Sequence, residues 1–267
     1  MRTLPKFGVA TNPSVDVLKE IKTIAGLGFD FVEICIEGPE GKPEILLEKK
    51  KDILSLLGKY KIFAIAHTSW WVELGSEYES VRNGWLEECK KAIEISSELG
   101  LRLLNLHSTS MGLYFRHKHK IIVLNNLVES LRQLVEYSKK YGVGIMLENV
   151  PPGYGISGLK DFKYIVDRVP ELKVHLDIGH TFVQDGMKNV ERYIKTFKDR
   201  IEHIHIHDNY GKRDDHLPVG RGRINFVRVV KMLKKINYDK TITLEVFTSK
   251  KDAMKSREKI KKLWMKK

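Results

Sequence analysis

Short apolar segments rich in β-branched residues alternate with longer amphipathic segments along the whole chain, and this alternation constrains the fold more than any other feature. Each apolar segment has the length of a strand, and each is followed by a segment with the period of a helix. The eight predicted strands cover residues 6–10, 31–36, 62–67, 102–107, 143–148, 173–177, 201–207 and 241–246.

The amphipathic segments complete this pattern. Helices are predicted at residues 14–27, 44–59, 79–99, 119–141, 159–168, 188–199, 226–236 and, rich in basic residues, at about 250–265. Eight β-then-α units favour an α/β protein with one (β/α)₈ barrel, the TIM barrel, as a single domain over residues 1–267. A doubly wound open sheet is the alternative, but the turn ATNPSVD after the first strand has no glycine-rich phosphate motif.

Composition excludes several other classes of protein. Hydrophobic residues make up 42% of the chain, which is enough for a large core. No run approaches the roughly 20 apolar residues of a membrane-spanning helix, and residues 1–13 lack the apolar stretch of a signal peptide, so we expect a cytoplasmic protein. The two cysteines, Cys35 and Cys89, form no CxxC pair. Any metal site must therefore use His, Asp and Glu.

The net charge of +13 raises the question of nucleic-acid binding, since Lys and Arg that neutralise phosphates provide most non-specific affinity. More than half of this charge lies in residues 250–267, which hold nine Lys or Arg and two acidic residues. Apolar residues spaced between these charges predict a surface helix with a solvated basic face. The last helix of a barrel runs away from the catalytic face, so its charge gives little support to a nucleic-acid partner.

Residue types that bind metals stand at the ends of six consecutive predicted strands. Active-site residues of a (β/α)₈ barrel come from these carboxyl ends and the loops after them. A single strand-end His is more often a hydrogen-bonded core residue than a ligand, and an Asp there can cap the next helix. Six coinciding strand ends nevertheless favour a joint site. The residues are His67, His107, Glu148, Asp177, His205 with His207, and Glu245.

Strand alternation places several of these side chains inside the barrel, because residues two apart share one side of a strand. In the strands that contain Glu148 and Glu245, bulky apolar residues occupy one side and the Glu lies on the other. Ionised carboxylates inside a barrel are costly unless they are paired or a cation binds them. Nitrogen and oxygen ligands without thiolates suit Zn²⁺, Mn²⁺ or Co²⁺, so we predict one or more divalent ions. His175 and His203 lie deeper on the inward side, which favours a supporting or core role.

Several motifs, taken together and in this order, resemble the xylose isomerase-like barrels. That family contains sugar and sugar phosphate isomerases and epimerases, and also endonuclease IV. The motifs are FGVATNP, AHTSWWVELGS, LGLRLLNLHS, LENVPPG, HLDIGH, HIHIHDN, DDHLPVGRGRINF and TLEV.

The resemblance implies a metal-dependent isomerase or epimerase of a sugar, sugar phosphate or related polyol. In that branch the metal polarises the substrate carbonyl and stabilises an enediolate. Two Glu, Glu148 and Glu245, then move the proton as base and acid. The metal ligands that the resemblance implies are Glu148, Asp177, His205 and Glu245.

The same resemblance implies contacts with the substrate. His180 is expected at the substrate or at a second metal, and His207 at the substrate. Arg221 replaces the acidic residue that the family usually has in the PxGxG segment, and it is expected to meet either a sugar phosphate or an unusual substrate. Trp70 is expected to form a wall of the sugar pocket.

The endonuclease IV branch implies a different activity, in which three zinc ions cleave DNA at an abasic site. There Trp70 and Trp71 match side chains that enter the DNA stack. The chain departs from that branch by ATNPS after the first strand, by His207 in place of an asparagine, and by Ile178 and Gly179 in place of a Thr-Cys pair. We therefore expect a small-molecule partner, with DNA only under this alternative. The further ligands that a nuclease would use are His67, His107, His180, Asp214 and His216.

Overall fold

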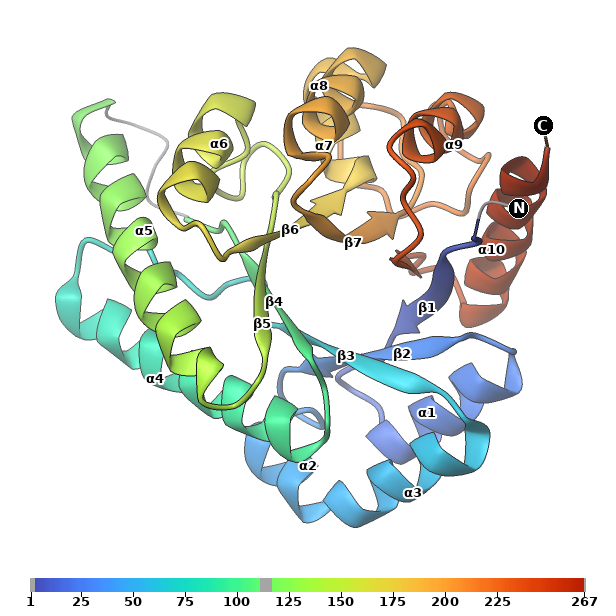
Figure 1. The fold of residues 1–267 in the computed structure, drawn as a ribbon, viewed down its shortest axis with the longest axis horizontal. Helices are drawn as coiled ribbons and strands as arrows, with labels where there is room; N and C mark the ends of the chain where they lie inside the picture. Colours follow the sequence, from blue (N-terminus) through green and yellow to red (C-terminus); the bar gives the residue numbers. More distant parts are fainter. Residues whose placement is uncertain (1–2, 111–116, 267) are drawn as a thin grey trace.

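The computed structural model describes residues 3–110 and 117–266. Eight strands form a parallel barrel: β1 (Lys6–Ala10), β2 (Phe31–Ile36), β3 (Phe63–Thr68), β4 (Leu103–His107), β5 (Gly144–Glu148), β6 (Lys173–Asp177), β7 (Ile201–Ile206) and β8 (Thr241–Leu244). Neighbours in the chain are neighbours in the barrel, and β8 pairs with β1 to close it (Figure 1). The predicted (β/α)₈ fold is therefore confirmed.

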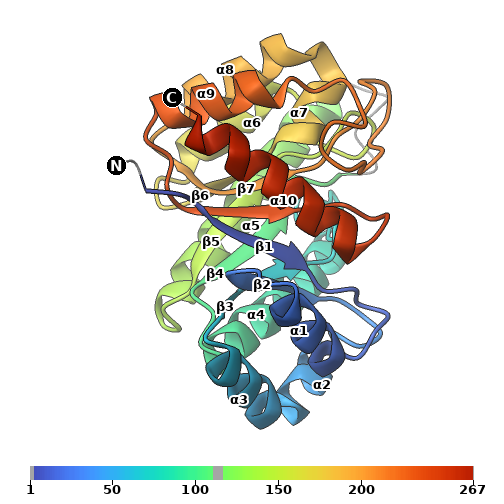
Figure 2. The same ribbon diagram turned by 90° about the vertical axis from the view of Figure 1, so that its right-hand side faces the viewer.

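Helices surround the barrel and connect each strand to the next (Figures 1 and 2). They are α1 (Val17–Gly26), α2 (Pro43–Glu48), α3 (Lys50–Tyr60), α4 (Glu79–Glu98), α5 (His117–Lys139), α6 (Leu159–Arg168), α7 (Ile178–Asp185), α8 (Met187–Phe197), α9 (Phe226–Lys235) and α10 (Lys250–Met265). None of these helices is long and apolar enough to cross a membrane.

Two helical segments differ from the prediction. The segment 44–59 is divided into α2 and α3 at Lys49, whose ψ of 4° leaves the α-helical range. Helix α7 was not predicted, because it begins directly after β6 with no intervening turn residues. Its N-cap is Asp177, the last residue of β6, and the side chain of Asp177 accepts a hydrogen bond from the backbone N–H of His180 at 2.6 Å. One residue thus ends a strand, starts a helix and faces the predicted site.

The apolar core fills the space between the barrel and its helices. Helix α10, for example, buries Ala253, Ile260 and Trp264 in this core. Figure 2 shows α10 lying across the side of the barrel near β1. A second, smaller apolar cluster of Phe31, Ile65 and Met146 lies apart from that core. These three residues lie on strands whose other inward side chains include histidines and carboxylates, so much of the barrel interior is polar.

Candidate metal centre

Four side chains from consecutive strands converge at the carboxyl end of the barrel. Each offers one oxygen or nitrogen atom, and these atoms all lie within 4.8 Å of one another. β5 and β6 end at two of these residues, while the other two lie at the penultimate position of β7 and directly after β8. We call this set the central group; its members are Glu148, Asp177, His205 and Glu245.

The carboxylates of the central group surround one imidazole nitrogen. Nδ1 of His205 lies 3.2 Å from Oε2 of Glu245, 3.7 Å from Oε1 of Glu148 and 3.9 Å from Oδ2 of Asp177. His205 and Asp177 are completely buried, and Glu148 is 1% exposed. A concentration of three acidic groups around one ring nitrogen, away from water, is unfavourable unless a positive charge is present.

The donor atoms of the central group fit a divalent ion. Nδ1 of His205, Oδ2 of Asp177 and Oε2 of Glu245 are buried and have no hydrogen-bond partner among residues 3–110 and 117–266. Buried polar atoms of native proteins are nearly always paired, so three unpaired atoms that face one another are compatible with a cation-binding site. Nitrogen and carboxylate oxygen ligands without a thiolate match Zn²⁺, Mn²⁺ or Co²⁺.

Neighbouring residues hold the central group in place. The Asn105 amide donates to Oε2 of Glu148 at 2.6 Å. The side-chain amide of Asn149 makes two hydrogen bonds to the backbone of Asp177, one to its N–H at 2.9 Å and one to its carbonyl at 3.1 Å. Since Asp177 also caps α7, its carboxylate is fixed by a strand, a helix and a neighbouring side chain at once.

Two histidines that were predicted as additional ligands lie near Oε2 of Glu148, whereas His205 lies near Oε1. Nε2 of His107 lies 3.2 Å and Nε2 of His67 lies 3.4 Å from Oε2 of Glu148. His67, His107 and Glu148, which we call the first flanking group, are buried and also have the spacing of metal ligands. Glu148 therefore belongs to both groups.

A second flanking group lies on the side of Asp177 and Glu245. It contains His180, His207, His216 and Glu245, with the Asp214 carboxylate between the rings. Oδ2 of Asp214 lies 2.8 Å from Nε2 of His216 and 3.1 Å from Nε2 of His180, and Oδ1 lies 3.3 Å from Nε2 of His207. His216 stacks on both His207 and Phe247, with ring centroids 4.1 Å and 3.9 Å away. All five predicted additional ligands thus adjoin the central group.

The position of His207 depends on a glycine of α7. A Cβ atom at Gly179 would lie 2.0 Å from the His207 ring, so only glycine leaves room for it. Nε2 of His207 also lies 3.3 Å from Oδ1 of Asp177, which puts this ring between the central group and the second flanking group.

Histidines control the charge of the acidic residues. Burial alone would raise the pKa of Glu148, but the neighbouring histidines, His175 foremost, hold this pKa well below its usual range. Burial likewise opposes ionisation of Glu245, yet His205 and His216 lower its pKa to about 2. The histidines therefore favour the ionised form of both carboxylates, which is the form that a metal ligand or a general base needs.

Two predicted substrate contacts lie outside these groups. Trp70 is 42% exposed in the loop after β3, where its ring contacts Tyr154 and Trp71 edge-on. Arg221 is exposed in the loop between β7 and α9. Within the described ranges the Arg221 side chain makes no hydrogen bond or ion pair with either flanking group, so its proposed contact depends on a bound substrate.

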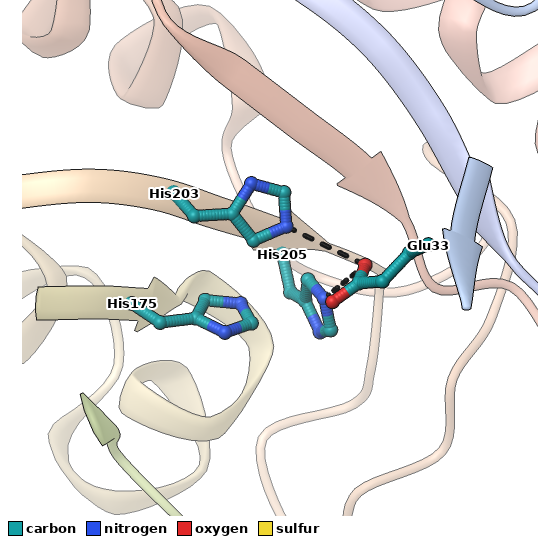
Figure 3. Close-up of side chains that lie close together, drawn as sticks. All are labelled: Glu33, His175, His203 and His205. Carbon is teal, nitrogen blue, oxygen red and sulfur yellow. Dashed lines mark hydrogen bonds and ion pairs between the residues drawn. The ribbon is translucent and has the colours of Figure 1, made fainter. Parts of the chain in front are cut away.

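One buried residue of this region was missed from the sequence. Glu33 of β2 is completely buried, and its Oε2 lies 2.9 Å from Nε2 of His205. The sequence carried a signal for it, because Glu33 is the single charged residue in the strand FVEICI and shares the side of Phe31. His175 and His203 are also fully buried and lie beside it (Figure 3).

Comparisons with known proteins agree with the fold and the motifs. The family model described as xylose isomerase-like TIM barrel matches residues 21–267. An uncharacterized protein of Methanocaldococcus jannaschii is 31% identical over 90% of this chain and 92% of its own length. The putative L-ribulose-5-phosphate 3-epimerase SgbU of Haemophilus influenzae is 25% identical over 84% of this chain and 82% of its own. A crystal structure of a D-tagatose 3-epimerase-like protein is 30% identical, with a TM-score of 0.84 over 97% of this chain and 96% of that chain. As its motifs predicted, the chain belongs to the xylose isomerase-like TIM barrel family.

Proposed function

We propose that this protein is a divalent-metal-dependent isomerase or epimerase that acts on a sugar, sugar phosphate or related polyol through an enediolate. The observation that supports this most directly is the central group, whose four donor atoms lie within 4.8 Å of one another at the carboxyl end of the barrel. Relatives named as 3-epimerases of L-ribulose 5-phosphate and of fructoselysine support the substrate class.

Glu148 and Glu245 are the proposed acid and base. Epimerisation removes a proton from the carbon next to a carbonyl on one face and returns a proton to the opposite face. The two Glu come from β5 and from the end of β8, with β6 and β7 between them, so they approach a substrate from different sides of the barrel. One Glu takes the proton as a carboxylate, and the other must carry a proton in the substrate complex so that it can return one to the opposite face.

The central group is the proposed binding site for Zn²⁺, Mn²⁺ or Co²⁺. A divalent ion there would supply Lewis acidity, which lowers the free energy of negative charge on the carbonyl oxygen. The chain itself fixes the two Glu: Asn105 holds Oε2 of Glu148, and His205 lies 3.2 Å from Oε2 of Glu245. His180 and His207, whose rings lie near the Asp177 carboxylate, are the proposed contacts of substrate hydroxyl groups.

Proton exchange tests this function. The protein is stripped of metal, reloaded with Mn²⁺ or Co²⁺, and incubated in deuterium oxide with D-tagatose, D-fructose or L-ribulose 5-phosphate. We expect metal-dependent incorporation of deuterium next to the carbonyl, seen by NMR, in at least one of these sugars and its loss in Glu245→Gln. Glu202→Gln is the matched control, because Glu202 is ion-paired with Lys173 and Lys240 at the opposite end of β7. The absence of exchange with every sugar and metal would contradict the proposal.

One observation favours a second candidate function, an apurinic/apyrimidinic endonuclease. The two flanking groups adjoin the central group, which gives the described chain three neighbouring sets of metal-ligand residues, and several adjacent ions suit phosphodiester hydrolysis. Exposed Trp70 and Trp71 at the mouth of the barrel are compatible with DNA as well as with sugars. Metal analysis and incubation with abasic duplex DNA decide between the candidates. About three zinc ions per chain together with strand scission would identify the nuclease.

A further inference from the structure

A fourth set of buried side chains lies on the Nε2 side of the His205 ring. It consists of Glu33 from β2, His175 from β6, and His203 and His205 from β7, and we call it the inner group (Figure 3). All four side chains are completely buried. The inner group and the central group have His205 in common.

Glu33 lies between two imidazole rings. Its Oε2 lies 2.9 Å from Nε2 of His205 and 3.4 Å from Nε2 of His203, as the dashed lines in Figure 3 show. The opposite nitrogen of His203, Nδ1, lies 2.7 Å from the hydroxyl oxygen of Thr241. A line of polar contacts therefore runs from β8 through His203 and Glu33 to His205.

The contact with Glu33 determines which nitrogen of His205 carries the proton. An ionised carboxylate accepts hydrogen bonds and donates none, so the 2.9 Å contact requires a proton on Nε2. A histidine that binds a metal ion does so as the neutral ring, so the remaining proton is then on Nε2 and the lone pair is on Nδ1. This is the nitrogen that faces Glu148, Asp177 and Glu245.

We propose that Glu33 is a positioning residue, which holds His205 through Nε2 in the orientation and tautomer that present the Nδ1 lone pair to the central group. The inference rests on the proposed function, because it assumes that the central group binds a metal. Metal-binding histidines commonly donate their other ring N–H to a carboxylate, and this partner makes the ring a better ligand.

The burial of Glu33 supports a role beyond packing. A carboxylate without access to water is costly, and Glu33 has no Lys or Arg partner in the described ranges to offset that cost. Its ion-pair contacts are to His203 and His205 alone among the residues of the structure. An apolar side chain would pack on the side of Phe31 without this cost, so the carboxylate serves the histidines.

A metal ion within the inner group itself is the competing explanation. Oε1 of Glu33, Nε2 of His203 and both ring nitrogens of His175 have no hydrogen-bond partner among the described residues. A metal ion in the inner group would replace the proton between His205 and Glu33. His205 would then bridge two metal ions, one in each group. The 2.9 Å separation favours the hydrogen bond, and the experiment below treats a second ion as a contrary result.

Two substitutions separate the charge of Glu33 from its hydrogen bond. Glu33→Gln keeps an acceptor oxygen without the charge, whereas Glu33→Met keeps the volume and removes the acceptor. We measure the Kd for Mn²⁺ and Co²⁺ by competition with a chromophoric chelator, which needs no substrate. We expect Glu33→Gln to weaken binding by about 10-fold and Glu33→Met by about 100-fold. Glu202→Gln, on the same strand as His205, is the control and should bind metal as the wild type does.

The tautomer of His205 is measured directly in the wild-type protein, so the test does not depend on the folding of the variants. ¹⁵N NMR of Zn²⁺-loaded protein, assigned with a His205→Gln sample, should show a proton on Nε2 and none on Nδ1. The proposal is overturned by a proton on Nδ1, by wild-type affinity in both Glu33 variants, or by an additional metal ion that disappears in His203→Gln.

These results remain distinct from those that test the enzymatic function. If no sugar is epimerised but Glu33→Met weakens metal binding, the positioning role stands and the proposed reaction does not. If Glu245→Gln leaves metal affinity unchanged, the central group itself is wrong, and the role of Glu33 falls with it.

Discussion

Nδ1 of His205 and Oε2 of Glu245 lie 3.2 Å apart in a buried site, yet neither atom has a hydrogen-bond partner in the described ranges. Burial alone would lower the pKa of His205, but the carboxylates of Glu33, Glu245 and Glu148 raise it well above its ordinary value. A proton on Nδ1 can therefore supply the positive charge between the two atoms when no metal is bound. A metal ion bound by this pair would replace that proton.

Glu245→Gln and Glu148→Gln should each abolish proton exchange at the substrate carbon. An amide cannot accept the proton, and it is a weaker ligand than a carboxylate, so the loss should exceed about 100-fold. Deuterium incorporation with the sugar that reacts in the wild-type protein measures the effect. Circular dichroism should show an intact barrel, because neither substitution changes the volume of the side chain. Retained exchange in either variant would remove that residue from the acid and base pair.

Two substitutions of Asp177 distinguish its proposed role as a metal ligand from its role as the N-cap of α7. Asp177→Asn keeps an oxygen that can accept from the backbone N–H of His180, whereas Asp177→Ala loses this hydrogen bond. We expect the loss of the α7 cap in Asp177→Ala to cost about 1 kcal/mol in the free energy of unfolding. Both substitutions should remove most of the stabilisation by saturating metal, which for a ligand at about 100 times its Kd is about 2.7 kcal/mol.

Urea unfolding with and without Mn²⁺ measures these two effects. Metal-free Asp177→Asn should be more stable than metal-free Asp177→Ala, because it keeps an acceptor for the backbone N–H of His180. Equal stabilisation of wild type and Asp177→Asn by Mn²⁺ would exclude Asp177 as a ligand.

The barrel and the central group could be predicted from the sequence because both follow from local periodicity. Strand alternation is strict, so the position of Glu148 after bulky residues at 143, 145 and 147 fixed the side on which it lies. The carboxyl ends of parallel strands then meet by topology alone. To predict that these four ligands lie together, only the order of the four strands in the barrel was needed in addition to local periodicity.

The inner group could not be assembled in the same way. The link between Glu33 and His205 joins residues 172 positions apart in the chain, on β2 and β7, which do not pair because β1 and β8 lie between them. Register and barrel stagger determine whether two such side chains meet, and the hydrophobic pattern fixes neither of them to within one residue. Helix α7 was missed for a local reason, since Asp177 acts as a strand end and as a helix cap.

Gly179 should be essential for the position of His207. A Cβ atom there would come within 2.0 Å of the ring, so Gly179→Ala forces His207 out of the site or shifts α7. We expect a loss of about 1–3 kcal/mol in the free energy of unfolding, as in other overpacked cores. Urea denaturation measures it. Gly84→Ala is the control. Gly84 is an exposed residue of α4, and a Cβ atom there would meet nothing within 4 Å. This substitution should stabilise the helix by about 0.5–1 kcal/mol.

Glu202 should make the stability of the barrel depend on pH at the end opposite the site. Its carboxylate lies 2.9 Å from Nζ of Lys240 and 3.1 Å from Nζ of Lys173. Partial burial alone would raise the pKa of Glu202, but these two ammonium groups hold it below its ordinary value of 4.5. A lowered carboxyl pKa stabilises the folded state above the unfolded pKa, and this stabilisation is lost as the pH falls through the folded pKa.

Glu202→Gln should therefore be less stable than the wild type at about pH 7 and equally stable once the pH has fallen below the folded pKa. Because the partners are partly exposed, with the lysine side chains at 40%, we expect a difference of only about 0.5–1 kcal/mol at neutral pH. Added salt should reduce it further, since exposed charges are screened. Urea titrations of both proteins across this pH range measure the difference, and a gap that stays constant or widens toward acid would show that Glu202 contributes through packing instead of charge.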